Sequence, residues 1–247
     1  MNGRHGAFIV NIAAREALSR VYIPPGQGIE IGALHAPLPV PPLSRVIYVD
    51  RLPLQALRDH YPELAHLTFV TPHVIDDGES LSSIGSGTQD FVIANHFIEH
   101  AEDPIGCLKT FYRVLKPGGV IYLSVPDKRR IFDKKRPLTA IRHLEADHRD
   151  GVVTSRLAHY AEWASLVLDK EGDDIPRYAE RLLRQRYSIH FHCWTFASFA
   201  LFLAHVLSNH VTAMELLYKR CFDFEGIFIL RSKPGAKPRQ ASAIGTR

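Results

Sequence analysis

Residues 90–100 read DFVIANHFIEH, and this stretch decides the fold. Its first part, residues 90–95, is a short apolar run of the kind that forms a strand covered on both faces. Asp103-Pro104 follows, an N-cap residue with proline at the first helical position, and the helical pattern ends at 116–119 before another apolar run over 119–125. The stretch therefore predicts a strand, a helix and a strand, the repeating unit of a parallel sheet.

Further short apolar runs lie on both sides of this unit. They predict strands over residues 28–32, 46–50, 69–75, 213–221 and 226–231. The last two are joined through Asp223-Phe224-Glu225, which indicates an antiparallel hairpin at the sheet edge, and residues 194–209 predict a core helix before it. The fold class expected is α/β: a three-layer sandwich with a seven-stranded, mostly parallel sheet and one antiparallel strand near its C-terminal edge.

The texture of the chain changes after the central strands. Residues 127–190 have few strand-like runs and predict a mainly helical insertion within a domain spanning residues 1–231. Residues 232–247 are rich in Pro, Gly, Ala, Ser and Lys and predict a disordered basic tail. The net charge of +4 lies largely in the segment from Arg231 onward, which has five basic residues and no acid, so the body of the protein is near neutral.

Composition narrows the class of protein further. The three cysteines, Cys107, Cys193 and Cys221, form no CxxC pair, which excludes a disulfide framework and favours a reducing, cytoplasmic compartment. The longest apolar stretch, over 194–206, is shorter than the ~20 residues of a membrane-spanning helix. We therefore expect neither a membrane segment nor a signal peptide.

Polar residues and glycines follow the first four predicted strands, where an open α/β sheet binds its ligands. They are Glu30 and Gly32, Asp50, Asp76-Asp77-Gly78, and Asn95-His96. An acid ending the second strand, about 20 residues after the first glycine, is placed to bind a ribose diol. An acid followed by glycine after the third strand can receive an adenine amino group and offer a backbone N–H. These positions predict a nucleoside-containing cofactor.

Three segments together, DFVIANHFIEH at 90–100, DP at 103–104 and RVLKPGG at 113–119, resemble the class I (Rossmann-like) S-adenosylmethionine-dependent methyltransferases. The closest likeness is to small bacterial type-11-like members, often linked to glycan or secondary-metabolite pathways, and it covers about residues 26–126. The resemblance implies S-adenosyl-L-methionine as cofactor. It further implies contacts by Glu30 and Gly32 at the methionine end, Asp50 at the ribose, Asp77 and Gly78 at the adenine, and Asn95 along the pocket.

One segment departs from the family pattern. The loop after Gly32 carries Pro37, Pro39, Pro41 and Pro42, which nearly forbid the helix that usually follows the first strand. We expect His35 or a residue of the N-terminal helix to replace that helix at the cofactor carboxylate.

Histidines supply the candidate catalytic bases: His100, which follows Glu99 near the site that the resemblance implies, and His190 and His192. If extended, His190-Phe191-His192 places both imidazoles on one face, where they could be two metal ligands, with a third from Glu99, His100, His148, Asp150 or His159. Because no third ligand is obvious from the sequence, no metal is assigned.

A basic stretch follows the fifth predicted strand: Lys128, Arg129, Arg130, Lys134, Lys135 and Arg136. It is expected either to overlook the pocket and favour an anionic acceptor, or to be a solvated loop. The function predicted is S-adenosylmethionine-dependent methylation of a small-molecule or glycan acceptor, with O-methylation by direct displacement favoured and neither nucleic acid nor membrane as partner. The alternatives are an NAD(P)-dependent oxidoreductase, for which Tyr112 and Lys116 have a suitable spacing, and a non-catalytic cofactor-binding domain.

Overall fold

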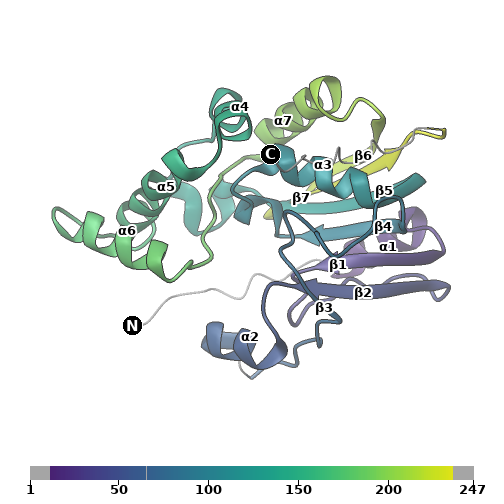
Figure 1. Cartoon of the computed structure of the whole chain (residues 1–247), viewed down its shortest axis with the longest axis horizontal. Helices are drawn as coiled ribbons and strands as arrows, with labels where there is room; N and C mark the ends of the chain where they lie inside the picture. Colours follow the sequence, from purple (N-terminus) through teal and green to yellow (C-terminus); the bar gives the residue numbers. More distant parts are fainter. Residues whose placement is uncertain (1–11, 65, 236–247) are drawn as a thin grey trace, which may run out of the picture.

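The computed structural model describes residues 12–64 and 66–235, built around a sheet in the order β3-β2-β1-β4-β5-β7-β6 (Figure 1). The strands are β1 (Gly26–Ile31), β2 (Ser44–Asp50), β3 (Val74–Ile75), β4 (Gln89–Asn95), β5 (Leu115–Pro126), β6 (Met214–Phe222) and β7 (Glu225–Ser232). β7 pairs antiparallel with both β5 and β6, and the pairs from β3 through β5 are parallel. The predicted seven-stranded sheet with one antiparallel strand is thus confirmed.

Helices cover both faces and one end of this sheet. They are α1 (Ile12–Tyr22), α2 (Leu54–His60), α3 (Pro104–Val114), α4 (Ile141–Asp150), α5 (Val153–Leu166), α6 (Asp174–Arg184) and α7 (Phe196–Asn209), with short 3-10 turns η1 (Pro62–Leu64), η2 (Ile98–His100), η3 (Lys128–Arg130) and η4 (Phe132–Lys135). Helices α4 to α6 and turns η3 and η4 occupy residues 127–190, and Figure 1 shows the three helices grouped to one side of the sheet. Among residues 12–64 and 66–235, no helix is long and apolar enough to cross a membrane.

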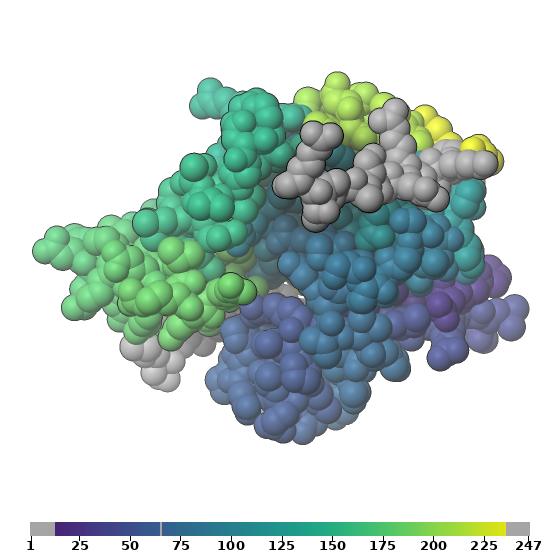
Figure 2. All heavy atoms as spheres, in the orientation of Figure 1, coloured from purple at the N-terminus to yellow at the C-terminus, as the bar shows by residue number. Residues whose placement is uncertain are grey.

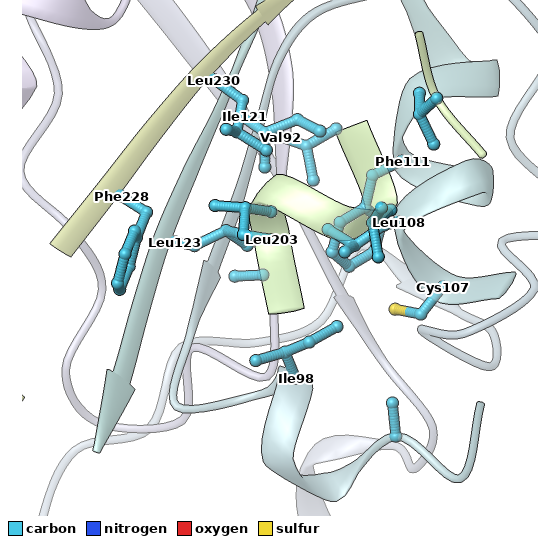
Figure 3. Packing of buried hydrophobic residues seen from close by; sticks show 14 of the residues in the cluster. Val92, Ile98, Cys107, Leu108, Phe111, Ile121, Leu123, Leu203, Phe228 and Leu230 are labelled. Carbon is cyan, nitrogen blue, oxygen red and sulfur yellow. The ribbon is translucent and has the colours of Figure 1, made fainter. Parts of the chain in front are cut away.

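Alternate side chains of the central strands pack into two separate cores, as a sheet covered on both faces requires. Val92 and Leu123 pack with α3 and α7, and Figure 3 shows Phe111 and Leu203 from these helices meeting the sheet. Phe91 and Tyr122 point to the opposite face, where residues of α1 and the proline-rich loop cover them. Because these strands are buried on both faces, their sequence is a continuous apolar run rather than an alternating one.

Helix α3 begins where the sequence predicts. The Asp103 side chain accepts a hydrogen bond from the Gly106 N–H at 2.9 Å, and Pro104 occupies the first turn. The helix ends at Val114, slightly before the predicted stop, because β5 already begins at Leu115, which pairs with Gln89.

The third strand is much shorter than the predicted run over 69–75. Pro72 has no N–H to donate within that run, and the Val70 N–H bonds the Leu34 carbonyl at 2.7 Å instead of β2. Only Val74 and Ile75 pair with β2. The loop from 33 to 43 contains no helix, as its prolines predict.

The structure describes residues 232–235 at the start of the predicted tail. Ser232 belongs to β7, and the Lys233 N–H still bonds the Ala213 carbonyl at 2.8 Å. The remainder of the predicted tail, residues 236–247, lies outside the described residues, as do residues 1–11.

Candidate active site

A cavity of about 840 Å³ opens where β1, β2, β3 and β4 end. Its opposite wall comes from the insertion: Arg156 and Tyr160 of α5, Leu183 of α6, and residues 186–188 and 191. In Figure 2 the surface is indented between the lobe of α2, in blue, and the lobe of α6, in green. A volume of this size lies within the range of small-molecule sites, about 300–1,000 Å³.

Four of the predicted cofactor residues line this cavity: Gly32, Asp50, Asp77 and Gly78. A side chain at Gly78 would displace its neighbours, because a Cβ atom there would lie 2.5 Å from the Phe97 ring and 2.6 Å from Ile31. Gly32 has a φ of 64°, a backbone conformation that glycine adopts without strain. Both positions at the cavity therefore favour glycine.

The carboxylates beside these glycines differ in how they are bonded. Both oxygens of Asp76 accept hydrogen bonds within the loop, from Ser82 and Ser83, so Asp76 shapes the turn. Asp77 accepts only from the Glu79 N–H, at 2.8 Å through Oδ1, among the described residues. Asp77 therefore keeps more of its hydrogen-bonding capacity for a ligand than Asp76 does, although both line the cavity.

Asp50 ends β2 and lies at the cavity. Burial raises the pKa of its carboxyl above 3.8, while the N–H groups of Arg51 and Leu52 act to lower it. A half-buried acid at this strand end can accept two hydrogen bonds from a ribose diol. Asn95 does not line the cavity, and its amide lies beside the Glu30 carboxyl, whose pKa it acts to lower. Its contact with a cofactor stays a prediction.

Glu30 does not lie where the resemblance implies. The strand alternation turns its side chain toward the layer of α1 and the proline-rich loop, where its carboxyl accepts the Leu38 N–H at 2.9 and 3.2 Å. Burial raises the pKa of Glu30 to about 8, against the opposing effects of the Leu38 N–H and the Arg15 charge. Glu30 therefore holds the loop that replaces the missing helix. Neither His35 nor any described residue of α1 lines the cavity, so that expectation is also wrong.

His100 is the one predicted base that lines the cavity. Its Nδ1 lies 2.9 Å from the Ile189 carbonyl, which can only accept, so Nδ1 carries the proton and Nε2 keeps a lone pair. Burial, with the neighbouring His190 adding to it, lowers the pKa of His100 well below 6.5. The side chain is thus a neutral imidazole in one fixed tautomer.

His190 lies behind His100 rather than in the cavity wall. Its Nδ1 bonds Asp133 Oδ2 at 2.6 Å, and its ring meets the His100 ring edge to face with centroids 4.6 Å apart. Arg136 fixes this pair from behind, donating to Asp133 Oδ1 at 2.9 Å and to the His190 carbonyl at 2.6 Å. Direct base catalysis by His190 does not fit this position; support of His100 does.

His192 lies farther from the site and cannot serve as its base. The side chain is fully buried and absent from the cavity wall, and its Nε2 donates to the Glu102 carbonyl at 3.2 Å. The extended His-x-His spacing thus separates two environments instead of joining both imidazoles at the active site.

Residues from three distant segments meet at the edge of the site. His96 lines the cavity in a left-handed backbone conformation, with φ of 51°, and its Nε2 lies 2.8 Å from Glu225. Arg15 of α1 also bonds Glu225, through Nε at 2.8 Å. No sequence motif indicates this group. The position of Glu225 follows from the sheet topology: because β7 is antiparallel to β5, the first residue of β7 must lie beside the carboxyl end of β5.

The basic stretch over 128–136 does not overlook the cavity. None of its six cations lines the wall. Arg129 pairs with Asp127 at 2.7 Å, Arg136 is buried between Asp133 and Glu162, and Lys128 donates to the Lys134 carbonyl at 3.0 Å. Of these cations, Lys128 and Arg136 are buried and hold the start of the insertion together.

Comparison with known proteins gives a family match. A family model described as a methyltransferase domain matches residues 34–188. A search of curated proteins gave no match. Solved structures resemble the chain in fold alone. One from Rhodobacter sphaeroides, provisionally named as a zinc-dependent alcohol dehydrogenase, has a TM-score of 0.51 at 14% identity, over 89% of this chain and 90% of that one. One from Bacillus halodurans, provisionally named as a methyltransferase, has a TM-score of 0.49 at 14% identity, over 91% of this chain and 99% of that one. A SAM-dependent methyltransferase from Aquifex aeolicus has a TM-score of 0.45 at 10% identity, over 83% of this chain and 81% of that one.

Proposed function

Because the chain belongs to the methyltransferase domain family, as a class I S-adenosylmethionine-dependent enzyme, we propose that it methylates a hydroxyl group of a small-molecule or glycan acceptor. The observation that carries the proposal is the position of His100. It lines the cavity with the cofactor residues and the insertion, and the Ile189 carbonyl holds the proton on Nδ1, so that the lone pair is on Nε2. A hydroxyl nucleophile needs such an acceptor, since its oxygen must lose a proton as the methyl group arrives.

The residues present fit S-adenosyl-L-methionine. Asp50 would bind the ribose hydroxyls, Asp77 and the backbone at Gly78 would meet the adenine, and Gly32 would lie at the methionine end. When bound, the cofactor supplies a methyl group on a sulfonium whose thioether is already a good leaving group. The protein therefore has to orient the acceptor, exclude water and take up one proton.

The wall of the insertion can perform the orienting step. Tyr160, Leu183 and Phe191 present apolar and aromatic surface to the cavity, while Tyr187 and Ser188 add hydroxyl groups. Arg156 and Glu102 neutralise each other there, in an ion pair of 2.7 Å. A wall of this mixed character favours a neutral ring with hydroxyl substituents, such as a sugar or a phenol, over a strongly anionic acceptor.

His100 would then accept the acceptor proton at Nε2. The Ile189 carbonyl holds its Nδ1–H and so fixes the ring orientation, and the His190–Asp133 pair packs behind it. Because burial keeps His100 neutral, its lone pair is free without prior deprotonation. His100 is thus proposed as the base, with His190 and Asp133 positioning it.

Other parts of the expected setting remain proposals. The cavity volume of about 840 Å³ supports a small acceptor, since it lies within the range of small-molecule sites, about 300–1,000 Å³. The cysteines Cys107, Cys193 and Cys221 are all free thiols, which fits a reducing compartment such as the cytoplasm.

Calorimetric titration with S-adenosylmethionine and with NADPH tests the cofactor first. Binding of S-adenosylmethionine alone is expected, and tight NADPH binding in its place would favour the oxidoreductase alternative. Pooled sugars, phenols and metabolites are then incubated with methyl-labelled cofactor. A labelled ether product is expected; label on nitrogen or carbon would refute O-methylation, and binding without any labelled product would favour a non-catalytic domain.

The base assignment is tested by His100→Gln against a matched control, His210→Gln, whose side chain bonds Glu145 and is absent from the cavity lining. Loss of a general base lowers kcat by about 10²–10⁴-fold, so His100→Gln should do this without changing the affinity for S-adenosylmethionine. The control should keep the activity of the unmodified protein. Full kcat in His100→Gln would overturn the assignment.

A further inference from the structure

We propose that His143, Asp147, His159 and His192 bind one divalent transition metal ion, best matched by zinc, within the insertion. Ligand atoms of the three imidazoles all lie within 4.8 Å of one another. The Nε2 atoms of His143 and His159 are 3.0 Å apart, and Asp147 Oδ2 lies 3.1 Å from the first and 3.9 Å from the second. Zinc–ligand bonds of about 2.0–2.2 Å in a tetrahedron place neighbouring ligand atoms about 3.3 Å apart, close to these separations.

One buried atom of this group, His192 Nδ1, has no hydrogen-bond partner among the described residues, and its side chain is fully enclosed. The His192 ring donates through Nε2 to the Glu102 carbonyl, so Nδ1 is the atom with the free lone pair. The buried Asp147 Oδ2 lies beside the His143 and His159 nitrogens and adds a negative charge to the group. A buried lone pair without a partner is costly, and a cation bound by these side chains would satisfy it. The bond from His192 to the Glu102 carbonyl fixes its ring orientation, as partners behind a metal ligand commonly do.

The ligands come from three separate segments. His143 and Asp147 are four residues apart on one face of α4, His159 lies on α5, and His192 lies in the segment before α7. Figure 1 shows α4 and α5 adjoining, with the chain from α6 to α7 running past them. Four protein ligands leave no open coordination position, which is the pattern of a structural ion rather than a catalytic one.

The place of the ion explains what it would do for the enzyme. His159 stands between Arg156 and Tyr160, and His192 follows Phe191; all three neighbours line the cavity. A cross-link between α4, α5 and the segment before α7 would therefore hold the acceptor wall in place. This inference stands on the ligand geometry and does not require that the acceptor be known.

A second histidine group nearby shows what a site without a metal looks like. His205 and His210 both bond the same oxygen of Glu145, and this group is half-exposed. Its polar atoms are satisfied by one another, so nothing there calls for an ion. This group supplies the control variant.

The test uses the full chain, dialysed against a chelator and then titrated with Zn²⁺ and separately with Co²⁺. We expect one equivalent of Zn²⁺ and a tetrahedral Co²⁺ absorption spectrum. His143→Ala, which changes a partly exposed side chain, and Asp147→Asn should each weaken Zn²⁺ binding by more than about 100-fold. His210→Ala should bind as the unmodified protein does, and circular dichroism should confirm that all variants are folded.

Either of two results would overturn the proposal. The first is a folded, unmodified chain that binds no more Zn²⁺ than His143→Ala does. The second is an equal loss of binding in His210→Ala. Methyl transfer is not part of the readout, so failure of the metal site and failure of the proposed activity remain distinguishable.

Discussion

Replacing Glu225 by glutamine should destabilise the protein by about 3 kcal/mol at neutral pH. Glu225 is 1% exposed, and its carboxylate accepts hydrogen bonds from Arg15 of α1 and from His96 beside the cavity. The substitution keeps the shape of the side chain but removes its charge. Arg15 would then stay buried with only the Ser124 hydroxyl, at 3.1 Å, and a neutral amide as partners.

The magnitude follows from the carboxyl itself. Burial alone would raise its pKa, but the hydrogen bonds from His96 and Arg15 outweigh burial and lower the pKa of Glu225 from 4.5 to about 2. At about 1.36 kcal/mol for each pH unit between the folded and unfolded values, this corresponds to about 3 kcal/mol. This value agrees with the general finding that removing one partner of a buried ion pair costs about 3–5 kcal/mol.

The sign of the pH dependence is also fixed. A carboxyl whose pKa is lowered in the folded state stabilises it fully above the unfolded value, here about 4.5, and loses that effect as pH falls toward 2. The difference between the unmodified protein and Glu225→Gln should be about 3 kcal/mol at pH 7 and about 2 kcal/mol at pH 3.5. Urea unfolding followed by circular dichroism measures both values.

Glu215→Gln is the matched control, because Glu215 pairs with Arg231 in the same hairpin. That pair is about 40% exposed on both sides, at 2.7 Å, and exposed pairs contribute about 0–1 kcal/mol. If Glu225→Gln cost no more than Glu215→Gln, or if its cost were the same at pH 3.5 as at pH 7, the reasoning from the buried network would be refuted.

Two further predictions concern the cavity. Asp50→Asn should weaken S-adenosylmethionine binding by about 10–150-fold in calorimetry, since a hydrogen bond to a charged group contributes about 1.5–3 kcal/mol. Asp59→Asn, an exposed change on α2, should bind as the unmodified protein does. Equal affinities of Asp50→Asn and Asp59→Asn would contradict the ribose contact. In the pH profile of kcat/KM, the acid limb should lie below pH 6.5, because burial lowers the pKa of His100 and a base must be unprotonated. An acid limb above pH 7 that persists in His100→Gln would show that another group is the base.

Local signals explain why the centre of the fold could be predicted. The start of α3 is set by Asp103 and Pro104, and apolar runs flank the helix. Because these signals act within a few residues of one another, they can be recognised from the sequence alone. The prediction of a third strand over 69–75 was too long, because Pro72 interrupts the hydrogen bonding of that segment and only Val74 and Ile75 pair with β2. The proline is visible in the sequence, but the apolar residues around it favour a strand.

Side-chain direction was harder to predict than strand position. Glu30 and Gly32 are two residues apart, yet Gly32 lines the cavity, while the Glu30 carboxyl accepts a hydrogen bond from the Leu38 N–H in the proline-rich loop. Likewise, His190 and His192 share a sequence pattern, but His190 bonds Asp133 beside Glu99 and His100, whereas His192 lies beside His143 and His159. These choices depend on which distant segment packs against each residue, which spacing alone does not specify.

The chain also replaces the helix that its prolines exclude. The proline-rich loop and α1 together cover the face of the sheet formed by Phe91 and Tyr122, and Glu30 fixes the loop by accepting the Leu38 N–H. With α1 comes Arg15, which reaches Glu225 and, through it, His96 at the cavity edge. The covering of the second face and the shaping of the active site therefore rest on the same N-terminal helix. A sequence change in α1 that displaced Arg15 would act on both, although none of the described residues of α1 lines the cavity.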